Sequence, residues 1–130
     1  MIKKTKGSLK WIKKENNLRN LGTHLIVEFW GGLDINDSKK FEKFLVEAAR
    51  AAKATPLQVN THEFSPQGIT GVVLLSESHI TFHSWPEFKY LALDIFTCGN
   101  KCQPYQALDY LKKKIKPKQV QVTEIKRGFV

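Results

Sequence analysis

Four extended segments follow one another between residues 56 and 97 with no helical segment between them, and this run limits the possible fold more than any other feature of the chain. Turn residues separate the segments, with Ser65-Pro66-Gln67-Gly68 after the first and Pro86 before the last. The predicted strands cover residues 56–64, 69–76, 79–85 and 90–97. Grouped strands of this kind are typical of an antiparallel sheet rather than of a parallel sheet with helical crossovers.

One helix is predicted on each side of this run. The first has apolar residues at helical spacing, begins at a cap provided by Asp37 or Ser38, and extends to about Lys53. The second covers residues 105–115 and ends before Pro117. Single strands at 23–30 and 120–125 complete the order strand, helix, four strands, helix, strand. This order predicts an α+β fold, an antiparallel sheet with two helices on one face, which is a two-layer sandwich.

Such a sheet has a second face that needs a partner or solvent. In the strand at 23–30 one face is apolar, and the other carries the mixed set His24, Ile26, Glu28 and Trp30. A second copy of the chain is one way to cover this face and to create a shared site.

The positive charge is concentrated at one end of the chain. The net charge is +9, and residues 1–20 hold seven of the 21 basic residues but one of the 12 acidic residues. We therefore divide the chain into a basic N-terminal extension, residues 1–20, and a single domain, residues 21–130, as the length of 130 residues predicts. The extension suits contact with nucleic acid. Because no nucleic-acid recognition motif accompanies it, we do not expect nucleic acid as a partner.

The expected compartment is the cytoplasm, with no membrane span and no metal. No apolar run approaches the roughly 18 residues that a span needs, and the N-terminus lacks the apolar core of a secretory signal. In a reducing compartment Cys98 and Cys102 are expected as free thiols, and they lack a second pair at zinc-site spacing. His79 and His83 lie on a predicted strand, where residues four apart are about 13 Å apart, so they do not form a metal-binding pair.

The stretch from residue 74 to 87 has the sequence LLSESHITFHSWPE. It resembles the self-processing segment of the small prokaryotic S-adenosylmethionine decarboxylases. Four further segments resemble the same family in the same order: residues 22–31 (GTHLIVEFWG), 64–72 (FSPQGITGV), 94–99 (DIFTCG) and 124–128 (EIKRG). Five motifs in order are far more specific than any one of them. The basic extension lies outside the resemblance.

The resemblance implies a proenzyme that cuts its own backbone between Glu77 and Ser78, giving a β chain of residues 1–77 and an α chain of residues 78–130. The Ser78 hydroxyl attacks the preceding carbonyl to form an ester, and β-elimination of this ester leaves dehydroalanine. Hydrolysis of dehydroalanine releases ammonia and leaves a pyruvoyl group in place of Ser78. This group, rather than pyridoxal phosphate, is the implied cofactor, because it condenses with the substrate amine and accepts the electrons released as CO2 leaves. Neither chain has enough strands for a core, so both are expected to stay associated.

The resemblance also implies roles for further residues. Thr70 and His83 match the hydroxyl and the histidine base that serve self-cleavage, with Thr70 standing where many relatives have serine. Cys98 matches the proton donor of the decarboxylation. The positions that bind adenine and ribose in the family are, in this chain, Phe64, Trp85 and Glu87.

The implied reaction converts S-adenosylmethionine to the aminopropyl donor of spermidine and other polyamine synthesis. Family members of this length pair through their sheets as homodimers, which implies a four-layer α-β-β-α arrangement of αβ protomers with sites near the subunit boundary. One alternative keeps the chemistry and takes arginine as the substrate, as some archaeal relatives do. Two alternatives come from other classes: a basic nucleic-acid-binding module, and an inactive homologue that regulates an active partner.

Overall fold

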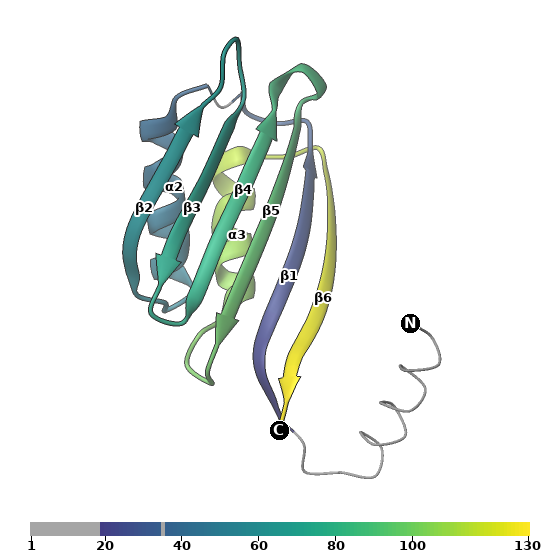
Figure 1. The fold of residues 1–130 in the computed structure, drawn as a ribbon. Coiled ribbons are helices and arrows are strands. Elements are labelled where there is room, and N and C mark those ends of the chain that lie inside the picture. Colours follow the sequence, from purple (N-terminus) through teal and green to yellow (C-terminus); the bar gives the residue numbers. More distant parts are fainter. Residues whose placement is uncertain (1–18, 35) are drawn as a thin grey trace.

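Figure 1 shows the computed structural model of the chain, which describes residues 19–34 and 36–130. The elements follow the predicted order, with β1 (Asn20–Trp30), α2 (Ser38–Ala51), β2 (Pro56–Glu63), β3 (Ile69–Leu75), β4 (Ser78–Trp85), β5 (Tyr90–Cys98), α3 (Pro104–Ile115) and β6 (Gln119–Phe129). A short 3-10 turn, Pro86–Phe88, joins β4 to β5. The basic extension predicted for residues 1–20 lies outside the described residues, except for its last two positions.

All six strands form one antiparallel sheet in the order β2-β3-β4-β5-β1-β6. Strands β2 to β5 are successive neighbours, while β1 pairs with β5 on one side and with β6 on the other. Helices α2 and α3 contact each other and lie on the same face of the sheet (Figure 1). The predicted α+β two-layer sandwich is confirmed.

Local sequence determines where the helices begin. Asp37, rather than Ser38, caps α2, because its carboxylate accepts the backbone N–H groups of Lys39 and Lys40 at 3.0 and 3.3 Å. Helix α3 begins at Pro104, whose fixed φ suits a first helical turn. Neither these helices nor any other part of the described chain provides a helix long and apolar enough to cross a membrane.

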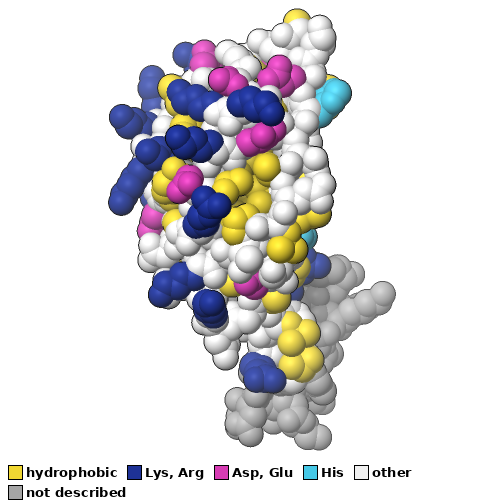
Figure 2. Space-filling model, turned by 90° about the vertical axis from the view of Figure 1, so that its left-hand side faces the viewer, with side chains coloured by type: hydrophobic (Ala, Val, Ile, Leu, Met, Phe, Trp, Pro, Cys, Tyr) yellow, Lys and Arg dark blue, Asp and Glu magenta, His cyan; other side chains and the backbone are white. Residues whose placement is uncertain are grey.

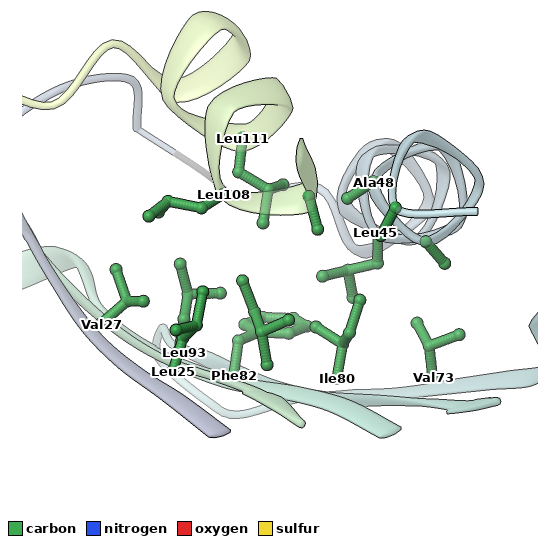
Figure 3. Packing of buried hydrophobic residues seen from close by; sticks show 14 of the residues in the cluster. Leu25, Val27, Leu45, Ala48, Val73, Ile80, Phe82, Leu93, Leu108 and Leu111 are labelled. Carbon is green, nitrogen blue, oxygen red and sulfur yellow. The ribbon is translucent and has the colours of Figure 1, made fainter. Parts of the chain in front are cut away.

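The core fills the space between the helices and the sheet (Figure 3). Its labelled side chains come from both layers: Leu25, Val27, Leu45, Ala48, Val73, Ile80, Phe82, Leu93, Leu108 and Leu111. The ring of Phe82 packs against Phe41, with centroids 3.9 Å apart, and crosses Gly71 of β3. A Cβ on Gly71 would lie 2.1 Å from Cε1 of Phe82, so this packing requires glycine.

Basic side chains surround the helices. Those at and beyond the end of α3 are all exposed: Lys112, Lys113, Lys114, Lys116 and Lys118. Cations in the last turn complement the partial negative charge of a helix C-terminus. Figure 2 shows Lys and Arg gathered on the helical side of the molecule with Asp and Glu among them, which is the pattern of a solvated surface.

Strand β6 is longer than the predicted 120–125, because it pairs with nearly the whole length of β1, from Asn20 opposite Phe129 to Trp30 opposite Gln119. Every residue of β6 is exposed, so no alternation of buried residues marks its ends in the sequence.

The sheet face opposite the helices, which we call the open face, has no covering element among the described residues (Figure 1). Strand β1 contributes the mixed set that the sequence predicted, including His24 and Glu28. Strands β4 and β5 contribute alternate residues: His79, Thr81, His83 and Trp85, and Tyr90, Ala92, Asp94, Phe96 and Cys98.

Candidate functional site

The residues predicted to carry function lie at two opposite ends of the sheet. Glu77, Ser78 and Cys98 lie where the β3–β4 turn ends, and we call them the turn-end cluster. The aromatic-end cluster lies at the other end of β4 and consists of Phe64, Thr70, His83, Trp85 and Glu87. Ser78 and His83 are five residues apart along β4, roughly 16 Å for an extended strand. One copy of the chain therefore does not bring the two clusters into contact.

Glu77 is held at three points. Its backbone carbonyl accepts a hydrogen bond from the N–H of Cys98 at 2.9 Å. Its carboxylate accepts one from the backbone N–H of Thr55 at 2.9 Å and one from the Thr55 hydroxyl at 3.3 Å. The carbonyl that precedes Ser78 is thus fixed, and a backbone donor already points at its oxygen, where negative charge develops during nucleophilic attack.

Ser78 begins β4 in a strained backbone conformation. Its φ is 135°, a value that residues with a side chain rarely adopt. It directly follows the turn residues Ser76 and Glu77. Its Oγ lies 3.0 Å from Nδ1 of His79. A hydroxyl beside a nitrogen base and a fixed carbonyl is an arrangement suited to acyl transfer.

Cys98 ends β5 beside the same peptide bond. Its side chain is exposed and its thiol is free, and the thiol of the half-buried Cys102 is free as well. Burial raises the pKa of the Cys102 thiol, with smaller contributions from Glu77 and Cys98, so Cys102 stays protonated at neutral pH.

Rings and a polar pair form the aromatic-end cluster. The centroid of the His83 ring lies 5.7 Å from that of Phe64 and 4.1 Å from that of Trp85. Thr70 and His83 face each other across β3 and β4, and the Thr70 hydroxyl hydrogen-bonds Nδ1 of His83. Glu87 is exposed in the 3-10 turn that follows Trp85.

Three rings to which the sequence assigned no role in the site extend this cluster. The ring centroid of His62 lies 4.6 Å from that of Phe64. The ring of Tyr90 stacks on Trp85 with centroids 5.2 Å apart, and on Trp30 with centroids 4.2 Å apart. The signal that identifies them is strand register, because Tyr90 is the partner of both tryptophans and His62 is the partner of Thr70. It becomes visible only when the order of strands in the sheet is known.

Polar side chains occupy the middle of the open face. Asp94 accepts hydrogen bonds from Nε2 of His24 at 2.9 Å and from the Thr81 hydroxyl at 3.3 Å. Tyr90 donates to Glu28, and burial, aided by this hydrogen bond, raises the pKa of Tyr90 to about 12. Within residues 19–34 and 36–130, no three His, Cys, Asp or Glu side chains are grouped so as to hold a metal ion.

The chain is similar to known proteins over most of its length. The family described as S-adenosylmethionine decarboxylase matches residues 23–128. An S-adenosylmethionine decarboxylase proenzyme of Methanococcus maripaludis (strain C5) is 46% identical over 115 residues, which cover 87% of this chain and 94% of the relative. The proenzyme of the same name from Clostridium tetani is 43% identical over 114 residues, 86% of this chain and 90% of the relative.

A solved structure extends the similarity to three dimensions. The crystal structure of the adenosylmethionine decarboxylase from Aquifex aeolicus matches with a TM-score of 0.79 at 34% identity and covers 86% of this chain and 94% of that one. The matched residues 23–128 include both clusters, four complete strands of the sheet and most of the other two, and the chain therefore belongs to the S-adenosylmethionine decarboxylase family.

Proposed function

We propose that this chain is a proenzyme that cleaves itself between Glu77 and Ser78 and then decarboxylates S-adenosylmethionine. The relatives named above are S-adenosylmethionine decarboxylases, and two of them are named as proenzymes; none of them supports the arginine alternative. One observation supports self-cleavage above all: the carbonyl oxygen of Glu77 accepts a hydrogen bond from the N–H of Cys98 at 2.9 Å, next to the strained backbone of Ser78.

The proposed cleavage uses groups of the chain and one molecule of water. The Ser78 hydroxyl attacks the carbonyl carbon of Glu77, and the peptide C–N bond breaks to leave an ester. Loss of the Cα proton of Ser78 then expels the Glu77 carboxylate, and hydrolysis of the remaining enamine releases ammonia and leaves a ketone. The residues fit a pyruvoyl group at position 78, which supplies an electron sink for decarboxylation without pyridoxal phosphate.

The substrate-binding proposal assigns the adenine and the sulfonium to aromatic side chains. Phe64 is 45% exposed, so its ring is available to a ligand, and both Phe64 and Trp85 pack against the His83 ring. Ring faces attract a cation such as the sulfonium. The exposed Glu87 carboxylate has two acceptor oxygens for the ribose diol. The Cys98 thiol is the proposed proton donor to the substrate α-carbon.

We also propose that two copies pair through their open faces as a homodimer. A two-fold axis that lies between the sheets and runs across the strands would set each turn-end cluster against the partner's aromatic-end cluster, because packed sheets lie about 10 Å apart. Thr70 and His83 of one copy would then serve Ser78 of the other, in a four-layer α-β-β-α arrangement. This pairing is supported by the separation of Ser78 from His83 within one copy, roughly 16 Å.

The two products of cleavage would remain associated. Residues 1–77 contribute β1, β2 and β3, and residues 78–130 contribute β4, β5 and β6. In the sheet these strands are interleaved, because β4 and β5 lie between β3 and β1. Separation of the chains would break three strand pairs, β3–β4, β5–β1 and β1–β6. We place the enzyme in the cytoplasm, where its product would supply aminopropyl groups for polyamine synthesis.

Release of labelled CO2 tests the activity. Purified chain is incubated with carboxyl-labelled S-adenosylmethionine or arginine, and we expect CO2 from the first substrate only and none from a Ser78→Ala variant. Trp85→Ala should raise KM, whereas Phe88→Ala, which removes a ring that is 69% exposed in the neighbouring turn, should leave KM unchanged. Release from arginine, or no release by a fully cleaved chain, would contradict the proposal.

A further inference from the structure

We infer that His79 is the base that removes the hydroxyl proton of Ser78 in the first step of self-cleavage. The inference rests on the proposed self-cleavage and adds a catalytic residue to it. Nδ1 of His79 lies 3.0 Å from Oγ of Ser78, whereas His83 in the same copy lies roughly 16 Å away along β4. The two histidines therefore serve different steps, His79 from within the copy and His83 from the partner.

Packing holds the half-buried His79 ring in this position. The ring stands edge-on against Phe96, its register partner on β5, with centroids 5.6 Å apart. Phe96 is itself packed against His24 at 5.4 Å, and the guanidinium of Arg127 lies 4.6 Å from its ring. The ring of Phe96 thus supports the ring whose Nδ1 faces Ser78, whereas His24 contacts Phe96 and not His79.

Every proton and bond in the formation of the ester is accounted for by groups of the chain. In the tautomer with the ring proton on Nε2, Nδ1 of His79 takes the hydroxyl proton as Oγ of Ser78 bonds to the carbonyl carbon of Glu77. The carbonyl oxygen takes the negative charge beside the N–H of Cys98, at 2.9 Å. The C–N bond then breaks, and the nitrogen of Ser78 takes the proton from His79. The result is an ester and a free amine, with no water, oxidant or further reactant consumed.

Loss of His79 and loss of His83 are expected to stop self-cleavage at different steps. Without His79 the ester does not form, so the peptide bond between Glu77 and Ser78 persists. Without His83 the ester forms but the elimination stops, so the ester accumulates. Hydroxylamine cleaves an ester by aminolysis and leaves peptide bonds intact under the same mild conditions. Fragments of residues 1–77 and 78–130 that appear only after hydroxylamine treatment therefore measure the ester.

The experiment follows ester formation in the full chain. Each variant is produced by cell-free synthesis, sampled over time, treated with hydroxylamine and analysed by intact mass under denaturing conditions. His79→Asn retains a hydrogen-bond acceptor near the Nδ1 position but no base, and we expect ester formation to slow by about 100-fold or more. His83→Asn should accumulate the ester. The matched control is His24→Asn, which removes another histidine packed on Phe96 and should form ester at the wild-type rate.

Two further variants keep the test decisive. His79→Gln repeats the measurement if His79→Asn does not fold, and imidazole added to His79→Ala should restore ester formation if a base is what the variant lacks. Wild-type rates in both His79→Asn and His79→Gln would overturn the inference, as would an equal loss in His24→Asn. If the wild-type chain itself stays uncut, the proposed function fails instead.

Discussion

Cleavage across a dimer predicts that two defective variants repair each other. His83→Asn keeps the nucleophile Ser78 and lacks the base, whereas Ser78→Ala keeps the base and lacks the nucleophile. If the two are co-synthesised in equal amounts, random pairing places about half of the His83→Asn chains in mixed dimers. Those chains have their own Ser78 and the His83 of the partner subunit. We therefore expect cleavage of about half of the His83→Asn chains and of none of the Ser78→Ala chains.

The assay is intact mass under denaturing conditions, because the two variants differ in mass and each is counted separately. The control co-synthesises wild type with the double variant Ser78→Ala/His83→Asn. Wild-type chains in mixed dimers then face a partner without His83, so about half of them should remain uncut. No cleavage in the first mixture together with full cleavage of wild type in the second would refute the reasoning, because it would place both residues in one copy despite a separation of roughly 16 Å.

Three further predictions concern packing, the turn and pH. Gly71→Ala forces a Cβ to 2.1 Å from Phe82 and should lower the free energy of unfolding by about 1–3 kcal/mol, so an unchanged urea midpoint would argue against this packing. Thr55→Val removes a hydroxyl that holds Glu77 at 3.3 Å and should slow cleavage by about two- to tenfold, with Thr55→Ser as the control; equal rates for both would contradict the role. Because burial raises the pKa of Tyr90 from 10.0 to about 12, the stability contributed by its neutral phenol is present below pH 10 and is lost as the pH rises towards 12. The pKa values of Tyr105 and Tyr110 are raised as well, so Tyr90→Phe should reduce the loss of stability in urea titrations, and an undiminished loss would refute the assignment.

Periodicity in the sequence predicted the elements whose two faces differ. Leu25, Val27 and Phe29 alternate because they are buried against helices, and the pattern identified β1. Strand β6 lacks this contrast along its whole length, and the sequence therefore located only its middle. The extension of β6 depends on pairing with β1, which lies about a hundred residues earlier. A pattern of neighbouring residues does not show this pairing.

In the candidate site too, local sequence does not show which residues lie close together in space. The sequence places Ser78 and His83 within six residues of each other, but the rise of a strand separates them along β4. Thr55, which holds Glu77, lies 22 residues earlier in the link between α2 and β2, and no motif marks it. His79 is adjacent to Ser78 in the sequence, yet only the 3.0 Å contact between the two side chains suggests a role for it.

The intact mass of freshly purified wild-type chain under denaturing conditions tests the central claim most directly. We expect two species: residues 1–77, and a fragment of residues 78–130 that is lighter by one ammonia than its serine-terminated form. Cyanoborohydride reduction in the presence of an amine should shift the mass of the second fragment only, because that fragment has the ketone. A single species of 14.9 kDa that persists through long incubation would contradict the account, because Ser78 would not be converted.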